Sequence, residues 1–322
     1  MTAAPTPSYS AEHSFADSDQ LASQARQWDL EFLQLDRGEF RGRLLQFGVG
    51  NVHISEARFE RSLIQEGTPP AGLRTIGIPA NKDVRFSWRG ISIDSKHLLV
   101  FPRGSELSSV SNPDFHVYTC SIPEEVLGVV ADSLGVDELD SLVGDTGVVR
   151  CTSPALDSVR RCLVELCETA RYSGSYLSND HSVRRATDEL PRRLLAALST
   201  SANPRSSARV KSRALALIRA EHFIERFACE DISICDIARA AQVSQRTLEY
   251  AFTERYGLTP KSFLMAYRLG ALRQCLRLAD PTRDKVSDIA SRWGFWHMGQ
   301  LAADYRKQFD ELPSQTLRRV SV

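Results

Sequence analysis

The sequence has little cysteine and methionine, no net charge and no long apolar run. Its 322 residues include seven cysteines, three methionines, and 40 basic against 40 acidic side chains. The cysteines are odd in number and the closest two, Cys162 and Cys167, lie five residues apart, so we predict neither a disulfide framework nor a zinc site. No segment is apolar over membrane-spanning length, and residues 1–14 lack the basic end and apolar stretch of an export signal. We therefore expect a cytoplasmic protein with no membrane segment.

The zero net charge argues against a nucleic-acid partner, but the charge is unevenly distributed. Residues 205–322 contain 20 Lys and Arg against 13 Asp and Glu, whereas residues 1–204 contain 20 against 27, so the two parts carry +7 and −7. A basic segment attracts the phosphate backbone of DNA, and an acidic one does not. The charge distribution predicts a chain in two parts, of which only the C-terminal one contacts nucleic acid.

A motif occurs twice in the basic part, at residues 236–260 and 288–313. Asp236-Ile237-Ala238 recurs 52 positions on, and three later residues recur 53 positions on: Leu248, Phe252 and Pro260 match Leu301, Tyr305 and Pro313. The second copy therefore holds one extra residue in or just after its turn. Apolar residues at this spacing close the core of two short crossed helices, which predicts two helix-turn-helix units. Such a unit presents its second helix to the DNA major groove.

Residues 261–277, between the copies, have apolar side chains near a 3.6-residue period, which predicts a connecting helix. Two units, a connecting helix and a proline after each unit resemble the DNA-binding domain of the AraC/XylS family of bacterial transcription regulators. The resemblance covers residues 208–322 and implies a protein that binds double-stranded DNA, with a homodimer and RNA polymerase as expected partners. The alternative is an ordinary helical subdomain, which two tandem units at this spacing argue against.

The copies depart from the family pattern at three positions. The turn position that favours positive φ holds Gly294 in the second copy but Gln242 in the first, which predicts strain in the first turn. Tyr250 stands where the family often has arginine, so Arg246, one turn earlier, becomes the main candidate for reading guanine. Asp310 stands where the family commonly has glycine, and an acidic residue there can still cap a turn.

Side chains on the second helix of each unit are the candidates for DNA contact. Ser244 is also expected as a helix N-cap, and Trp293 and Phe295 are assigned to the core. Arg306 and Lys307 are either phosphate clamps or a solvated face. The second reading helix is expected over residues 296–307. The predicted contacts are Ser244, Gln245, Arg246, Thr247 and Tyr250 in the first unit, and Trp296, His297, Met298, Gln300, Arg306 and Lys307 in the second.

The N-terminal part has a strand pattern followed by helices. Residues 41–120 alternate short apolar stretches with turns, which predicts a small barrel or jelly roll, and the resemblance implies a cupin-like sensing barrel there. Helices are expected over residues 123–134, 154–170 and 187–198; the apolar stripe of the second fits a dimer interface or packing against the barrel equally well. The predicted fold class is α+β in two domains: residues 1–20 disordered, 21–198 a cupin-like sensing and dimerisation domain, 199–207 a linker, and 208–322 an all-α DNA-binding domain.

The barrel is expected to bind a small molecule without catalysing a reaction. His53, His97 and His116 occur singly, without the His-x-His of a metal-binding cupin, so we predict no metal, no cofactor and no enzymatic activity. Arg85, Trp88, His97 and Tyr118 are the candidates for holding an anionic or aromatic effector. The plainer interpretation of the first two is a surface arginine and a packed tryptophan.

The sequence therefore predicts a sequence-specific DNA-binding transcription regulator that responds to a small-molecule effector in its N-terminal domain. One alternative is a constitutive or architectural DNA-binding protein whose N-terminal domain only dimerises. The other is an oxygen-using cupin enzyme attached to a DNA-binding domain. A thermal-shift screen across metabolites tests the first alternative, and metal analysis of the purified protein tests the second.

Overall fold

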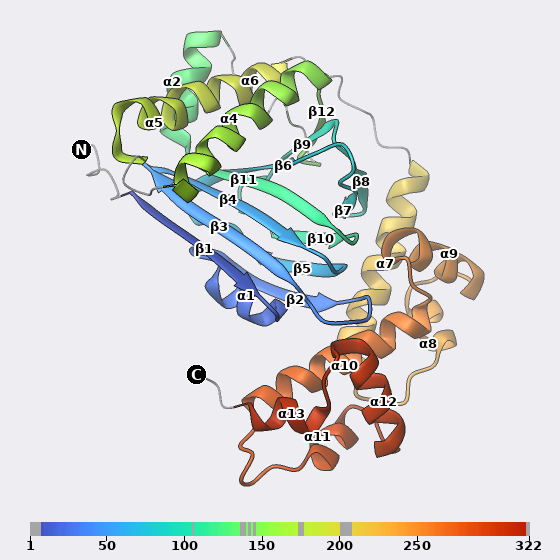
Figure 1. Ribbon diagram of the computed structural model, residues 1–322. Helices are drawn as coiled ribbons and strands as arrows, with labels where there is room; N and C mark the ends of the chain where they lie inside the picture. The colour runs from blue at the N-terminus through green and yellow to red at the C-terminus, as the bar shows by residue number, and fades with distance from the viewer. Residues whose placement is uncertain are drawn as a thin grey trace. The chain divides into compact units, whose positions relative to one another are not determined.

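The computed structural model of this chain describes residues 8–104, 106–135, 140, 143, 146–172, 177–199 and 208–319. The chain divides into two compact units (Figure 1). Unit 1 comprises Met1–Phe32, Arg41–Glu60 and Gln65–Arg205, and unit 2 comprises Leu33–Phe40, Arg61–Ile64 and Ser206–Val322. Unit 1 is rich in strands and unit 2 is helical, which confirms the predicted two-domain α+β class. The predicted linker falls almost wholly on residues 200–207, outside the described residues.

Unit 1 is built on two sheets. The larger has the strand order β1-β3-β4-β11-β6-β9-β12, and the smaller has the order β2-β5-β10-β7-β8. Pairing is antiparallel wherever the register is described, as expected for strands joined by short turns. The strands are β1 (Tyr9–Phe15), β2 (Asp29–Gln34), β3 (Gly42–Val49), β4 (Val52–Phe59), β5 (Leu63–Thr68), β6 (Leu73–Pro79), β7 (Phe86–Trp88), β8 (Ile91–Ile93), β9 (His97–Val100), β10 (Leu107–Ser111), β11 (Phe115–Pro123) and β12 (Val148–Arg150).

Helices cover one face of the large sheet (Figure 1). They are α2 (Glu124–Leu134), α4 (Ser153–Tyr172), α5 (Asp180–Arg184), the π-helical turn η2 (Arg185–Glu189) and α6 (Leu190–Ser199). Side chains from this face, such as Phe47, Ile54 and Cys120, share one core with α2, α4 and α6. The predicted stripe of α4 lies in the same core: Leu156, Val159, Leu163, Leu166 and Ala170. Packing within unit 1 therefore accounts for that stripe, and it is not available as a dimer interface.

Regular secondary structure begins closer to the N-terminus than the sequence predicts. Strand β1 pairs with β3 from Tyr9 opposite Gly48 to Phe15 opposite Gly42, and helix α1 (Ser18–Gln24) follows. Asp17 caps α1 by accepting the backbone N–H of Asp19 at 2.9 Å. The prediction of disorder to residue 20 is thus wrong for residues 9–20, because β3 supplies backbone partners that a local, polar sequence does not reveal. Residues 1–7 lie outside the described part of the chain.

Unit 2 contains the two predicted helix-turn-helix units and the connecting helix. The helix expected over residues 261–277 is α10, and it belongs to the core that packs the second unit. Tyr305 is fully buried in that core and its hydroxyl lies 2.8 Å from Thr316 Oγ1. The helices are α7 (Ala208–Phe227), α8 (Ile234–Ala240), α9 (Gln245–Tyr256), α10 (Pro260–Leu278), α11 (Val286–Arg292), α12 (Met298–Phe309) and α13 (Pro313–Arg318).

Unit 2 also includes the short segments Leu33–Phe40 and Arg61–Ile64. Gln34 Nε2 donates to the Gln308 carbonyl at 3.0 Å, and Gln308 Nε2 donates to the Gln34 carbonyl at the same distance. The Gly38 N–H donates to the Gln308 carbonyl at 3.2 Å. These bonds attach the first segment to the end of α12. The boundaries predicted from the sequence treat residues 21–198 as one continuous domain, whereas the structure interrupts that range twice.

A buried carboxylate on the helix-covered face of the large sheet holds a cluster of charges. Glu56, on β4, is 2% exposed; it accepts from His116 Nε2 at 2.8 Å and from Arg58 Nε at 2.7 Å, and Arg171 of α4 also binds it. Burial raises the pKa of Glu56, but the hydrogen bonds from His116, Arg58 and Arg171 outweigh it and lower the pKa to about 2. The carboxylate is therefore charged in the folded protein under all but strongly acidic conditions.

We predict that Glu56→Gln lowers the free energy of unfolding by about 2 kcal/mol at pH 7, because it removes the buried charge to which His116, Arg58 and Arg171 donate hydrogen bonds. Since the folded pKa lies below the ordinary value of 4.5, the wild-type contribution is complete above pH 4.5 and is lost as the pH falls towards 2. Urea unfolding at pH 7, 5 and 3 measures both effects. Glu60→Gln, an exposed carboxylate just after β4, is the control. This role would be contradicted if both variants lowered the free energy of unfolding equally at pH 7. It would also be contradicted if the difference between the two variants were as large at pH 3 as at pH 7.

Candidate nucleic-acid interface and apolar pocket

Helix capping defines the first helix-turn-helix unit. Ser233 and Asp236 form a capping box at α8: the Asp236 N–H donates to Ser233 Oγ at 3.3 Å, and the Ser233 N–H donates to Asp236 Oδ2 at 3.0 Å. Ser244 caps α9 by accepting the N–H of Thr247 at 3.2 Å, which confirms its predicted N-cap role. Helix α9 ends at Gly257, whose φ of 66° allows a left-handed cap.

The second helix-turn-helix unit has the same backbone hydrogen bond in its turn as the first. Within each turn one N–H returns to the first helix at 3.1 Å, from Val243 to the Ala238 carbonyl and from Phe295 to the Ala290 carbonyl. These partners lie 52 residues apart, whereas Ser244 and His297, the N-caps of α9 and α12, lie 53 apart. The extra residue inferred from the sequence is therefore Trp296. It is 74% exposed, immediately before the second reading helix.

The turns differ in the residue that adopts positive φ. Gln242 has a φ of 58° and Gly294 a φ of 78°, which confirms that the first turn places a side chain in the left-handed region. Arg219 Nη1 donates to Gln242 Oε1 at 2.6 Å and helps to hold that residue. Asp310 ends α12 with a φ of 58°, which confirms that it replaces glycine as a cap. The strained positions thus coincide with the departures noted in the sequence.

All eleven predicted DNA-contacting residues are exposed. Arg246 and Tyr250 lie four residues apart and so share the outer face of α9, while Leu248 and Phe252 are buried on its inner face. The second helix begins at Met298, not at residue 296, so Trp296 precedes it and His297 is its N-cap. Trp293 and Phe295 pack against the core, as predicted. The exposed set is Ser244, Gln245, Arg246, Thr247, Tyr250, Trp296, His297, Met298, Gln300, Arg306 and Lys307.

Several of these side chains have partners within unit 2. The hydroxyls of Ser244 and Thr247 lie 2.8 Å apart, and Gln245 Nε2 lies 2.7 Å from Cys235 Sγ. In α12, Gln300 Nε2 donates to Asp304 Oδ2 at 2.9 Å, which uses one of the two N–H donors of the Gln300 amide. Arg306 and Lys307 stand in the last turn of α12, where cations also complement the helix dipole. The first reading helix therefore offers the stronger donor, Arg246.

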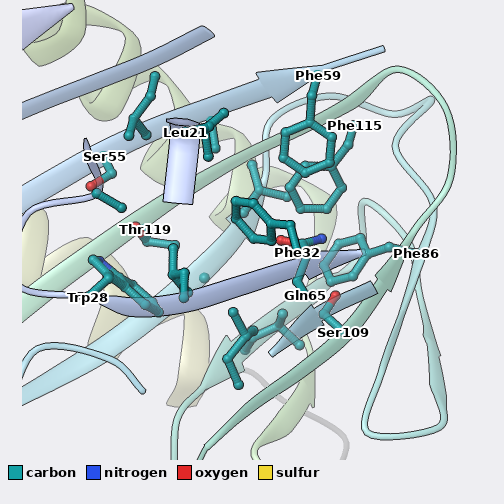
Figure 2. Close-up of a pocket in the computed structure, with 18 of the residues that line it drawn as sticks. Leu21, Trp28, Phe32, Ser55, Phe59, Gln65, Phe86, Ser109, Phe115 and Thr119 are labelled. Atoms are coloured by element: carbon teal, nitrogen blue, oxygen red, sulfur yellow. The ribbon is translucent and has the colours of Figure 1, made fainter. Parts of the chain in front are cut away.

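A pocket lies between the two sheets of unit 1, on the face of the large sheet that the helices do not cover (Figure 2). The lining side chains surround about 690 Å³ of space, part of it open to solvent. One end is aromatic: the rings of Phe59 and Phe115 stack at 4.5 Å, and Phe86 meets Phe115 edge-on at 5.3 Å. Trp88 meets Phe101 edge-on at 4.4 Å elsewhere in the lining. Such surroundings suit an apolar, flat molecule.

The polar groups in the lining are few and neutral. Gln46 accepts the Arg26 backbone N–H at 2.9 Å and donates to Ser55 Oγ at 3.3 Å, so both of its ends are engaged. By contrast, three buried atoms in the lining have no hydrogen-bond partner: Gln65 Nε2, Trp88 Nε1 and Ser109 Oγ. An unsatisfied buried polar atom costs about 1–3 kcal/mol, so three in one pocket wall require an explanation.

Of the four residues predicted to hold a ligand, the structure places only Trp88 in this pocket. Arg85 is exposed and its guanidinium donates to the Lys82 and Val84 carbonyls. His97 pairs with Asp94 at 2.8 Å, and Tyr118 points to the opposite face of the sheet, into the helix-covered core. The four do not form one site. Strand alternation accounts for Tyr118, whose neighbours Val117 and Thr119 line the pocket.

The sequence reasoning missed most of the pocket. Gln65 and Ser109 lie on β5 and β10, and neither they nor Phe59, Phe86 and Phe115 were among the residues predicted to hold a ligand. Among the described residues, no group of three or more His, Cys, Asp or Glu side chains is arranged to hold a metal. No helix in the same described part of the chain is long and apolar enough to cross a membrane.

Comparisons with known proteins match the C-terminal part of the chain. Residues 237–319 match the family described as a helix-turn-helix domain. The XylDLEGF operon transcriptional activator of Pseudomonas putida is 37% identical over 101 residues, 31% of this chain and 32% of that protein. The regulatory protein HrpB of Ralstonia nicotianae is 31% identical over 138 residues, 43% of this chain and 27% of that protein. The chain thus spans about a third of the length of these relatives.

Among solved structures, the AraC-like transcriptional activator CuxR aligns over 87% of this chain and all of its own length, at 13% identity and a TM-score of 0.44. A likeness at that level assigns no function to the chain.

The two turns allow a reciprocal exchange of residues. We predict that Gln242→Gly raises the free energy of unfolding by about 1 kcal/mol, because glycine adopts positive φ without the Cβ penalty. Gly294→Gln is expected to lower it by a similar amount; a Cβ at residue 294 would lie 3.7 Å from the nearest atom of Arg268, so strain and not a clash would be the cause. Thermal and urea unfolding of the full chain measure both. A destabilising Gln242→Gly would show that the bond from Arg219 outweighs the strain.

Proposed function

We propose that the protein is a sequence-specific DNA-binding transcription regulator of the AraC/XylS type, because its C-terminal helices match a helix-turn-helix family and are similar to part of a transcriptional activator. The observation that supports this proposal most strongly is the pair of 12-residue helices, α9 and α12, each held by the same turn bond and each exposing polar and basic side chains. A helix of this length presented by a helix-turn-helix unit fits the major groove.

The proposal assigns reading and positioning to different residues. Arg246 would read guanine from the first turn of α9, with Ser244, Gln245, Thr247 and Tyr250 around it. In the second unit, Arg306 and Lys307 would bind phosphate, and Trp296, His297, Met298 and Gln300 would face the groove. The net charge of +7 over residues 205–322 supports phosphate contact by this part of the chain.

We further propose that unit 1 is a cupin-like sensing unit whose pocket binds a small effector. Its two facing sheets and aromatic pocket support this role. A homodimer is part of the proposal, and the exposed Val129 and Leu134 of α2 are apolar side chains that a partner subunit would cover. Contact with RNA polymerase and a cytoplasmic location follow from a regulator's task at promoters. No catalytic step is assigned to the chain.

Binding to DNA tests the proposal directly. The full chain is incubated with sheared genomic DNA, bound fragments are recovered and sequenced, and the affinity for a recovered site is measured by fluorescence anisotropy from 50 to 300 mM salt. The proposal expects a recurrent site and an affinity that falls steeply with salt, because phosphate contacts release counterions. Recovery of no recurrent sequence would favour the architectural alternative, and failure to bind DNA at any salt would refute both.

We predict that Arg246→Ala and Lys307→Ala have different effects on DNA binding. Arg246→Ala should cost about 1–3 kcal/mol on the recovered site and little on random DNA, since it removes a base contact. Lys307→Ala should weaken both DNAs alike and reduce the salt slope by about 1, since it removes a phosphate contact. Arg283→Ala, an exposed arginine between α10 and α11, controls for loss of one positive charge. Equal losses on specific and random DNA in both variants would show that these roles are misassigned.

We also predict unequal halves in the recovered site. The exposed start of α12 presents Met298 and Gln300, and one N–H of the Gln300 amide already donates to Asp304. Most base discrimination should therefore come from α9, and the half-site read by α12 should be degenerate or defined by A·T content. Randomised-site selection with the full chain measures this. Two equally sharp halves within one protomer's site would mean that His297 and Gln300 read bases directly.

A further inference from the structure

The side chains that line the pocket of unit 1 limit the chemistry of a ligand that could bind there. Resting on the proposed role of unit 1 as a sensor, we propose that its effector is an uncharged, mainly apolar molecule about the length of two aromatic rings, with an acceptor oxygen. Aromatic ketones, esters, lactones and amides belong to this class. Carboxylates, phosphates and amines do not.

Three unpartnered polar atoms form a row in the small sheet. Ser109 and Trp88 are directly opposite each other on β10 and β7, so their side chains share one face, and Gln65 lies on β5, the other neighbour of β10. All three side chains are more than nine-tenths buried and line the pocket. Gln65 Nε2 and Trp88 Nε1 can only donate a hydrogen bond, and Ser109 Oγ can do so. The row therefore calls for an acceptor in the ligand.

The large sheet gives the pocket a polar end and an aromatic end. Gln46, Ser55 and Thr119 are aligned across β3, β4 and β11 by the sheet register. Phe59 and Phe115 lie four residues further along β4 and β11, on the same face (Figure 2). Four residues of strand span about 13 Å, which matches two linked aromatic rings with one polar group. A ligand of that shape would reach both ends.

The lining contains no charged side chain. The titratable group of β4 on the same side as Ser55 is His53, two residues away; burial lowers its pKa, so it is neutral near pH 7. Arg26 is the nearby cation, but it is exposed and its guanidinium stacks on the Tyr9 ring at 4.8 Å, outside the lining. Glu56, Arg58 and His116 project to the opposite face of the sheet. A buried ligand charge would therefore have no counter-ion, which is strongly unfavourable.

Three probes of one shape test the proposal on the full chain. They are 4-acetylbiphenyl, which is neutral with an acceptor, 4-ethylbiphenyl, which is neutral without one, and biphenyl-4-carboxylate, which is charged. Isothermal titration and thermal shift should rank their affinities in that order. Relative to the ketone, we expect the hydrocarbon to bind about five- to tenfold more weakly and the carboxylate about a hundredfold more weakly. Binding of the carboxylate as tightly as the ketone would overturn the proposal, as would equal binding of ketone and hydrocarbon or no binding of the ketone.

Single substitutions then locate the acceptor contact. Ser109→Ala and Trp88→Phe each remove one polar atom, Gln65→Leu removes both polar atoms of the amide, and all three keep most of the side-chain volume. At least one should abolish the preference for ketone over hydrocarbon while leaving hydrocarbon affinity unchanged. Ser108→Ala, on the same strand but outside the lining, is the matched control and should change neither. Ser109→Ala is the smallest change, and circular dichroism confirms that each variant is folded. A full ketone preference in all three variants would overturn the proposal.

DNA binding, measured in parallel, separates this inference from the proposed function. A chain that ranks the probes as expected but binds no DNA would refute the regulator and leave the pocket chemistry intact. A chain that binds a specific DNA site but fails the ranking would refute the pocket chemistry alone.

Discussion

The alternation of side chains along β3, β4 and β11 is the constraint on which unit 1 depends. Both faces of these strands are enclosed, so each strand supplies residues to two different environments in turn. Phe47, Ile54 and Cys120 enter the core beneath the helices, and Gln46, Ser55 and Thr119 face the pocket. A shift of register by one residue would exchange the two sets and place amides and hydroxyls against the helices. The helix core and the pocket are therefore specified together.

In unit 2 the corresponding constraint is the left-handed turn position. Gln242 and Gly294 each reverse the chain so that the following N–H returns to the first helix of its own unit. Because that bond closes before Trp296, the extra residue of the second unit falls in an exposed position and leaves the packed core unchanged. The two reading helices can thus differ in their surfaces while the helix pairs beneath them stay alike. The arrangement requires a non-glycine residue, Gln242, to adopt a strained positive φ in the first helix-turn-helix unit.

Regular periodicity made much of the fold predictable. The connecting helix was predicted over residues 261–277 and is Pro260–Leu278, and the stripe of α4 was identified residue by residue. Strand β1 was not predicted, because its polar sequence gains order only from pairing with β3. The exposed face of α9 follows from helical spacing, so the candidate DNA residues could be named in advance. The pocket could not, since a period of two shows which residues share a face and not which face the helices cover.

The same alternation explains why the pocket is neutral. Glu56, Arg58 and His116 occupy the positions of β4 and β11 that point away from it, and there Arg171 of α4 completes an ion cluster. Ser55 directly precedes Glu56 and Thr119 lies three residues after His116, and both are on the opposite face. A carboxylate buried in the pocket would meet no guanidinium group, whereas on the helix-covered side Arg58 and Arg171, together with His116, hold Glu56 ionised. By placing charge on one face and neutral polar groups on the other, the sheet keeps its ion cluster apart from the proposed ligand pocket, so a substitution in the ion cluster should alter stability before it alters ligand choice.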